Sequence, residues 1–197
     1  KETKGWRKSC RKNRELNNVL RENKIKNSDV DTELPKELLI GLHESYFDSH
    51  GNLVKTIIFR DGKESEQIKH CFDIRKIVFV EEQGVPVEEE LDNFDDLSIH
   101  VLALIDNKPV ATGRLIPSSD GCAKVGRMAV LSEFRRTGIG SKVLSFLEKK
   151  AIKKGINVIS LHAQEYVKKF YKNQEYIERG NVFLEAGIKH IEMYKKL

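Results

Sequence analysis

From residue 53 onward, the hydrophobic positions follow spacings that are typical of secondary structure. Residues 53–59 are apolar and β-branched and follow a Gly-Asn pair, so they predict a strand. Between residues 65 and 79, apolar side chains recur at near-helical spacing, which predicts a helix that ends before Pro86. The acidic segment 87–96 shows neither period, and we expect a loop there.

The second half of the chain alternates strand-like and helix-like runs. Strands are expected at residues 98–105, 109–117, 123–130, 158–161, 176–178 and 190–195. The first two are joined by Asp106-Asn107-Lys108, a spacing that suits a β-hairpin. Helices are expected at 140–154, where Leu144, Leu147 and Ala151 share a face, and at 165–172. This order predicts a mixed α/β or α+β sheet.

Composition and charge divide the chain in two. Its 197 residues are 39% hydrophobic and 33% charged, as expected for one globular domain, and the apolar runs are too short to span a membrane. Residues 1–26 contain ten basic and three acidic residues, so the net charge of +5 arises entirely there. We therefore predict a basic N-terminal extension, residues 1–50, and one domain, residues 51–197. We interpret the extension as solvated and partly helical; the alternative is a nucleic-acid-binding arm.

The three cysteines are odd in number and widely spaced. Cys10, Cys71 and Cys122 show neither a disulfide framework nor the spacing of zinc ligands. We therefore expect no metal and a reducing compartment, the cytoplasm.

A phosphate-binding turn is predicted between the strand at 123–130 and the helix at 140–154. It consists of Arg135, Arg136, Thr137, Gly138, Ile139, Gly140 and Ser141. The glycines let the backbone turn sharply and approach a ligand, and the N–H groups at a helix start favour a diphosphate. The two arginines can add charge-assisted hydrogen bonds to phosphate oxygens.

Two familiar phosphate loops are excluded by spacing. A Walker A loop needs Gly directly before Lys, but Ser141 separates Gly140 from Lys142. The dinucleotide fingerprint needs a third Gly where Val143 stands. On its own the motif leaves open a plain glycine-containing turn before a surface helix.

The pattern Arg-x-x-Gly-x-Gly after an apolar strand resembles the coenzyme A signature of the GCN5-related N-acetyltransferase (GNAT) superfamily. The resemblance extends over most of residues 50–197, including the segments 75–92 and 183–193. It implies the GNAT fold, a mixed and mostly antiparallel sheet flanked by helices, with two strands splayed to form an acetyl-CoA slot. It also implies acetyl-CoA as co-substrate and a homodimer formed through the C-terminal strands.

The resemblance also assigns roles to residues. Backbone groups of Met128, Ala129 and Val130 would pair with the acetyl carbonyl and the pantetheine amides, polarising the carbonyl as an oxyanion hole does. Tyr171 matches the Phe-Tyr element of the family and would donate a proton to the departing thiolate. Core packing is the alternative role for this tyrosine. Glu175 stands where the family usually has Gly, which puts the local turn in doubt.

The acceptor ammonium must lose a proton before it attacks a thioester. Candidate bases are Glu81, Glu82, His100, His162 and His190. We favour His162, at the end of the strand beside the expected slot. Glu82, Arg114 and Arg127 are expected to bind the acceptor, although surface salt bridges are an equal possibility for the arginines.

These residues predict an N-acetyltransferase that acts on a small-molecule amine, with no nucleic-acid or membrane partner. Glucosamine 6-phosphate is the specific expectation, because basic residues near the cleft would suit a phosphosugar and the extended chain resembles a divergent branch of glucosamine-phosphate acetyltransferases. The alternatives are another small amine, a protein lysine, a coenzyme A-binding module without catalysis, or nucleic-acid binding through residues 1–26.

Overall fold

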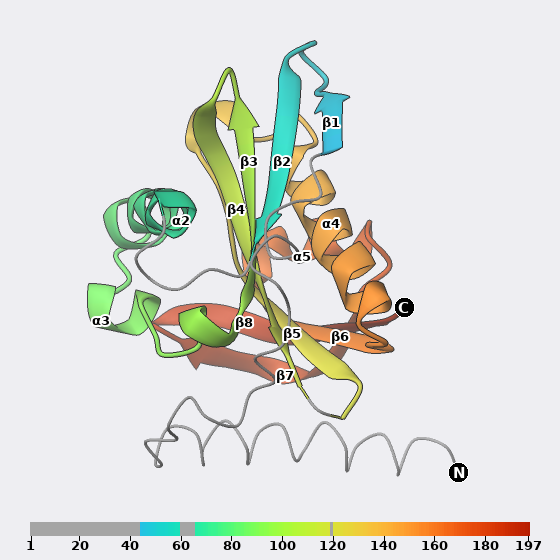
Figure 1. The fold of residues 1–197 in the computed structure, drawn as a ribbon. Helices are drawn as coiled ribbons and strands as arrows, with labels where there is room; N and C mark the ends of the chain where they lie inside the picture. The colour runs from blue at the N-terminus through green and yellow to red at the C-terminus, as the bar shows by residue number, and fades with distance from the viewer. Residues whose placement is uncertain (1–43, 60–65, 119) are drawn as a thin grey trace.

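The computed structural model describes residues 44–59, 66–118 and 120–197, and an eight-stranded sheet runs through them (Figure 1). In chain order the strands are β1 (Glu44–Phe47), β2 (Leu53–Phe59), β3 (Ile99–Ile105), β4 (Lys108–Pro117), β5 (Cys122–Val130), β6 (Val158–Gln164), β7 (Ile177–Glu185) and β8 (Ile188–Lys196). Their order across the sheet is β1-β2-β3-β4-β5-β6-β8-β7. Neighbouring strands are antiparallel except β5 and β6, which are parallel. The predicted mixed, mostly antiparallel sheet is confirmed.

Helices cover both faces of this sheet. They are α2 (Glu66–Arg75), its π-helical continuation η2 (Lys76–Glu81), α3 (Val87–Glu90), α4 (Ile139–Lys153) and α5 (Lys168–Lys172), with short 3-10 turns η3 (Asp95–Leu97), η4 (Ser132–Phe134) and η5 (Glu165–Val167). The pair α2 and α3 lies on one side of the sheet and α4 on the other (Figure 1). Within the described ranges, no helix combines the length and the apolar character needed to cross a bilayer.

Two hydrophobic clusters hold these layers together. Leu144, Leu147 and Ala151 of α4 are fully buried against β3, β4 and β5, which confirms the predicted helix face. On the opposite face, Ile68 and Ile74 of α2 are buried in a second, smaller cluster. Burying each large aliphatic side chain contributes about 1.5–3 kcal/mol, so packing rather than local propensity keeps both helices on the sheet.

A β-bulge in β5 lies opposite Gly113 of β4. The register runs from Thr112–Ala129 to Arg114–Gly126, so Arg127 and Met128 both oppose Gly113. Arg127 has the positive φ of 54° that accommodates the extra residue. A Cβ at Gly113 would lie 2.6 Å from Met128 Sδ, so the glycine is required for this close approach. Bulges of this kind redirect side chains beside functional sites.

The structure differs from two expectations. The division at residue 50 cuts a hairpin, because β1 pairs with β2 and the sheet already includes residues 44–47. The rest of the predicted extension, residues 1–43 with Cys10, lies outside the described residues. The acidic segment 87–96 is not simply a loop but contains α3 and the start of η3. Three glutamates in the first turn of α3 are favoured by the helix dipole, and tertiary ion pairs stabilise the segment further.

Candidate active site

The site begins where β5 and β6 separate. The two strands are paired only from Cys122–Val158 to Lys124–Ser160. Beyond that point both continue, β5 to Val130 and β6 to Gln164, without pairing to each other. The expected splay is therefore present, and it opens a slot whose apex lies at Lys124 and Ser160.

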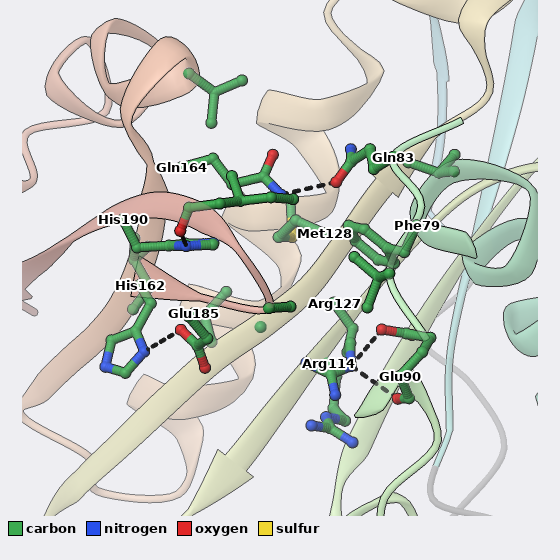
Figure 2. A pocket seen from close by; sticks show the side chains of 18 of the residues that line it. Phe79, Gln83, Glu90, Arg114, Arg127, Met128, His162, Gln164, Glu185 and His190 are labelled. Carbon is green, nitrogen blue, oxygen red and sulfur yellow. Dashed lines mark hydrogen bonds and ion pairs between the residues drawn. The ribbon is translucent and has the colours of Figure 1, made fainter. Parts of the chain in front are cut away.

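A cavity of about 1590 Å³ occupies this slot and extends towards η2, α3 and the β7–β8 hairpin. Pockets for a single small ligand usually enclose roughly 300–1,000 Å³, so this one has room for a coenzyme arm together with a second substrate. Figure 2 shows side chains from β4, β5, β6 and the β7–β8 hairpin converging on it. The slot therefore has room for more than one ligand.

The predicted diphosphate turn lies at the open end of the slot. Arg136 and Gly138 have φ angles of 66° and 91°, separated by Thr137, so the backbone forms a concave nest in front of α4. The Thr137 hydroxyl donates a 2.7 Å hydrogen bond to Phe134 O, and its carbonyl accepts one of 3.2 Å from the Ser49 N–H. These contacts fix the turn to the residues that precede it and to the β1–β2 connection.

The members of this turn differ in what they can offer a diphosphate. Ile139 and Thr137 are buried, so only their backbone N–H groups can face the ligand. Gly140 does not have a positive φ, which corrects the expectation that both glycines turn the chain. A Cβ there would make ordinary van der Waals contacts with Val130 and Phe170 at 3.6 to 3.7 Å, so neither φ nor space within the protein requires a glycine at this position. Arg136 and Ser141 also line the cavity.

Backbone groups of Val130 point into the slot. The Leu131 N–H donates to Val110 O of β4 at 3.0 Å, and Ala129 pairs with Thr112 in the same ladder. Because hydrogen-bonding direction alternates along a strand, Val130 turns its N–H and carbonyl away from β4, towards the slot. Ala129 turns its own groups towards β4 and is buried, so it is placed to support the strand rather than to contact the coenzyme.

Arg135 and Glu82 are bound to each other across the slot mouth. The Arg135 guanidinium forms an ion pair with Glu82 of the segment after η2 and donates a 2.9 Å hydrogen bond to Val130 O. Both side chains line the cavity. To bind phosphate oxygens, Arg135 must therefore give up its bonds to Glu82 and to Val130 O. Glu82, in turn, lies nearer the diphosphate end of the slot than its apex.

Tyr171 lies at the inner wall of the cavity, on α5. It is 8% exposed and packs edge-on against Phe170 and Tyr176, with ring centroids 4.9 and 5.9 Å away. Burial, with a smaller contribution from Tyr166, raises the pKa of its phenol, so the hydroxyl stays protonated at neutral pH. The position combines core packing with access to the slot, and both roles considered for Tyr171 are compatible with it.

His162 lies on β6 just beyond the apex, in a cluster of charged side chains (Figure 2). Its Nδ1 is 2.7 Å from Glu185 Oε2 and 3.4 Å from Lys124 Nζ. The His162 hydrogen bond, opposed by burial and aided by nearby positive charge, lowers the pKa of Glu185 to about 2. The carboxylate is therefore ionised at neutral pH.

The other candidate histidines are placed differently. His100 is buried beside Asp95, with its Nε2 2.9 Å from the Asp95 carbonyl oxygen, and it does not line the cavity. His190 lines the cavity, but its Nδ1 lies 2.9 Å from Ile188 O. Glu81 is exposed and outside the cavity lining. Of the candidate bases, His162 is the one that lies between the apex and the open cavity.

Arg114 and Arg127 belong to a buried network of ion pairs. Together with Arg75 they bind Glu90, Asp92 and Asp95, the three carboxylates that fasten α3 and η3 to the sheet. The contacts from Arg114 to Asp92 and to Asp95 are both 2.7 Å. Arg127 also donates to the backbone carbonyls of Glu89 and Glu90. The structure therefore disfavours both arginines as direct anion ligands, because carboxylates already neutralise them.

The carboxylates in this network respond differently to burial. Burial alone would raise the pKa values of Asp92 and Asp95, but bonds from Arg114 and Arg75 outweigh it and lower both. For Glu90 burial prevails and raises the pKa, despite Arg75 and Arg127. Removing one partner from a buried network of this kind leaves an uncompensated charge, at a cost of about 3–5 kcal/mol.

Several residues at the site were not identified from the sequence. Lys124 and Glu185 flank His162, and Gln83 joins the segment after η2 to β6 through a 2.7 Å hydrogen bond from the Gln164 amide. Gln83 and Glu185 lie within the segments 75–92 and 183–193 that resemble the family, but no role was assigned to them there, and only the folded chain brings them together. The sequence pattern that could have indicated Lys124 is the alternation of polar and buried residues along its strand. Among the described residues, no group of His, Cys, Asp and Glu side chains could hold a metal ion.

The splayed parallel pair, the turn before α4 and Tyr171 at the slot wall are the features that the GNAT resemblance implies. Residues 78–197 match the family model of the acetyltransferase (GNAT) domain. The chain therefore belongs to the GNAT family, as the sequence predicted, and is an acetyl-CoA-dependent N-acetyltransferase of that type.

Relatives and solved structures agree with this assignment. The chain is 40% identical over 135 residues to the uncharacterized N-acetyltransferase YjcF of Bacillus subtilis, covering 68% of this chain and 96% of that protein. A Lactobacillus plantarum structure assigned as an N-acetyltransferase shares 25% identity, with a TM-score of 0.67 over 73% of this chain and 98% of the other. An aminoglycoside 6'-N-acetyltransferase complexed with coenzyme A has the same fold, with a TM-score of 0.58, 20% identity and coverage of 71% and 96%.

Proposed function

We propose that this acetyltransferase moves the acetyl group to the primary amine of a small molecule bound between the slot apex and the β7–β8 hairpin. The observation that supports this most directly is the separation of β5 from β6 beyond Lys124 and Ser160. With the diphosphate nest at the open end, the acyl end of the coenzyme points back towards the apex. The acceptor would then meet it near Met128 and His162, both of which line the cavity.

Acetyl-CoA supplies the thioester carbonyl that the amine attacks. Backbone groups of Val130, directed into the slot, bind the coenzyme as an added strand would, and main-chain N–H groups of β5 stabilise negative charge on the carbonyl oxygen. His162 accepts the proton that the ammonium must lose, and Tyr171, kept protonated by burial, donates one to the sulfur. Two protons leave the ammonium nitrogen, one to His162 before attack and one as the tetrahedral intermediate collapses and the C–S bond breaks. One proton reaches the thiolate from Tyr171, which is then reprotonated, and one proton is released to solvent overall.

The identity of the acceptor amine depends on which charged groups in the cavity are available to it. The expectation of glucosamine 6-phosphate rests on the family resemblance and on basic residues near the cleft. Of these, Arg114 and Arg127 are neutralised by Asp92, Glu90 and Asp95. A phosphosugar would depend on Lys124 instead, whose ammonium lines the cavity beside His162. We retain glucosamine 6-phosphate as one candidate and place uncharged or cationic small amines beside it, since exposed Glu88 and Glu89 of α3 also line the cavity.

The test is direct detection of acetylated product. Purified protein is incubated with acetyl-CoA carrying a labelled acetyl group and a panel of amines that includes glucosamine 6-phosphate, glucosamine, polyamines, amino acids and lysine peptides. We expect labelled product from a small amine in equal amount to the coenzyme A released. Product from lysine peptides alone would replace the small-molecule proposal, and tight acetyl-CoA binding without any acetylated amine would show a non-catalytic module.

We also propose a homodimer formed through the C-terminal strands. β7 is an edge of the sheet, and its exposed side chains include Ile177, Val182 and Leu184. An unpaired edge with apolar side chains favours association with another strand. Light scattering should give twice the mass of the chain, and a Leu184→Lys substitution should reduce it to that of a monomer. A monomeric mass for the unmodified protein would exclude the dimer.

A further inference from the structure

Glu185 of β7 contacts His162, the proposed base on β6, although β8 lies between these two strands in the sheet. It is the last residue of β7, and it reaches over β8 to place Oε2 2.7 Å from Nδ1 of His162 on β6 (Figure 2). Phe183 packs edge-on against the same imidazole with a centroid distance of 4.8 Å. The ring is thus held by a carboxylate at one nitrogen and by an aromatic side chain against its face.

This contact determines which ring nitrogen carries the proton. An ionised carboxylate is only an acceptor, so His162 Nδ1 must be the donor in the 2.7 Å hydrogen bond to Glu185. In the neutral ring, Nε2 then has the free lone pair. A histidine with its proton on Nδ1 can accept a proton at Nε2, whereas the opposite tautomer would turn the lone pair towards Glu185 and Lys124.

Lys124 offers a competing arrangement. Its Nζ lies 3.4 Å from the same Nδ1, so an ammonium there could donate to a ring whose proton is on Nε2. The carboxylate contact is shorter by 0.7 Å and joins opposite charges whenever the ring is protonated. Burial lowers the pKa of Lys124, so a charged ammonium that donates to His162 Nδ1 is less favoured there than on an exposed lysine.

We propose that Glu185 is a positioning residue that holds His162 in the Nδ1–H tautomer and so presents Nε2 to the acceptor ammonium. This proposal rests on the proposed role of His162 as base. Glu185 touches no reacting atom, and it acts by orienting the ring and by stabilising the imidazolium that forms when the proton is transferred. The charged and titratable groups that surround this pair are Lys124 from β5 and His190 from β8. Lys124 is in turn influenced by Arg114, Arg127 and Glu192.

The first readout does not depend on turnover. Long-range proton–nitrogen NMR of the protein without substrate, at a pH where the ring is neutral, reports which nitrogen of His162 is protonated, and a His162→Gln variant assigns the signal. We expect the proton on Nδ1 in the unmodified protein and a mixture of tautomers in Glu185→Ala. A proton on Nε2 in the unmodified protein would overturn the proposal in favour of the Lys124 arrangement.

The second readout is the pH dependence of kcat/KM for the best amine of the panel. Loss of the carboxylate that orients a metal-bound histidine typically reduces activity by about 10- to 100-fold, and we take this as the scale for His162. We expect such a loss in kcat for Glu185→Ala, and we expect the acidic limb of the profile to move to lower pH in Glu185→Gln. The acidic limb moves to lower pH because the neutral amide of the Glu185→Gln variant favours protonation of the His162 ring less than the Glu185 carboxylate does.

Glu178→Ala is the matched control. Glu178 lies on the same strand, pairs with Lys172 and Lys168, and does not line the cavity. We expect it to leave the tautomer, kcat and pH profile unchanged. If Glu185→Ala behaves like Glu178→Ala in kinetics while changing the tautomer, His162 is not the base and the proposal fails. If no amine is acetylated, the proposed function fails, and the NMR result still decides whether Glu185 fixes the ring.

Discussion

Substituting Gly113 by alanine tests whether the bulge in β5 requires a glycine opposite it. A Cβ at this position would lie 2.6 Å from Met128 Sδ, 2.9 Å from Val143 Cγ1 and 3.1 Å from Leu147 Cδ1. Real Cβ atoms do not approach other heavy atoms within 3.0 Å, so at least two neighbours must move. Met128 can rotate its thioether, but Val143 is β-branched and buried within α4.

The magnitude follows from two opposing effects. Overpacking a dense core typically costs about 1–3 kcal/mol, while replacing glycine reduces the entropy of the unfolded chain and stabilises by about 0.4–1 kcal/mol. We therefore expect Gly113→Ala to lower the free energy of unfolding by about 0.5–2 kcal/mol. For a chain of this size, each kcal/mol lowers Tm by about 2–4 °C.

Gly126→Ala is the control, because Gly126 lies on the facing strand. A Cβ there would meet nothing within 4 Å, and the residue has no positive φ. We expect an unchanged or slightly higher Tm for this variant. Urea unfolding of both variants, followed by circular dichroism, gives the comparison. If Gly113→Ala unfolds at the same midpoint as Gly126→Ala, the close approach between α4 and β4 does not require a glycine.

Three further outcomes are expected. Tyr171→Phe should lower kcat by about 10²–10⁴ with little change in acetyl-CoA affinity, because acid catalysis is lost; Tyr176→Phe, outside the cavity lining, should not. Equal turnover of the two variants would assign Tyr171 to packing. Gly138→Val should weaken coenzyme A binding in calorimetry, since valine is strained at a φ of 91°. Arg75→Met should lower the free energy of unfolding by about 3–5 kcal/mol at pH 7, as it leaves Asp95 buried without one of its partners.

The same ion pairs predict the acid sensitivity of the protein. The pKa values of Asp92 and Asp95 are lower in the folded protein than the ordinary value of 3.8 for an aspartate, so the unfolded chain binds more protons in acid. Their contribution is present above that value and is lost as the pH falls below it. Urea midpoints should therefore decrease from pH 5 to pH 3, and the decrease should be smaller in Asp92→Asn. An unchanged slope in that variant would contradict the linkage.

The sequence predicts most strands of the sheet because they are short and bounded by turn residues. Leu53–Phe59 agrees with the prediction residue for residue, and β3, β4 and α4 differ from it by one or two residues at their ends. The C-terminal hairpin was recognised only in part. β7 alternates weakly because it is an exposed edge, so its pattern carries little hydrophobic signal.

By itself, the sequence determined where the turn proposed for the coenzyme lies. A nest before a helix needs its glycine and its helix start adjacent in the chain, so local spacing between Arg135 and Ser141 located the turn, and the family resemblance gave it its expected ligand. The family resemblance then supplied Tyr171 and the backbone of β5. These features are local, and a linear pattern records them.

Only the tertiary structure decided the acceptor half. Whether Arg114 and Arg127 are free or neutralised depends on Asp92, Glu90 and Asp95, which lie far from them in the chain and reach them only when α3 and η3 fold onto the sheet. The partner of His162 likewise comes from another strand pair, across β8. Charge compensation and tautomer choice are properties of spatial neighbours within a few ångströms. The sequence lists the charged groups, and the fold decides which of them remain available to a substrate.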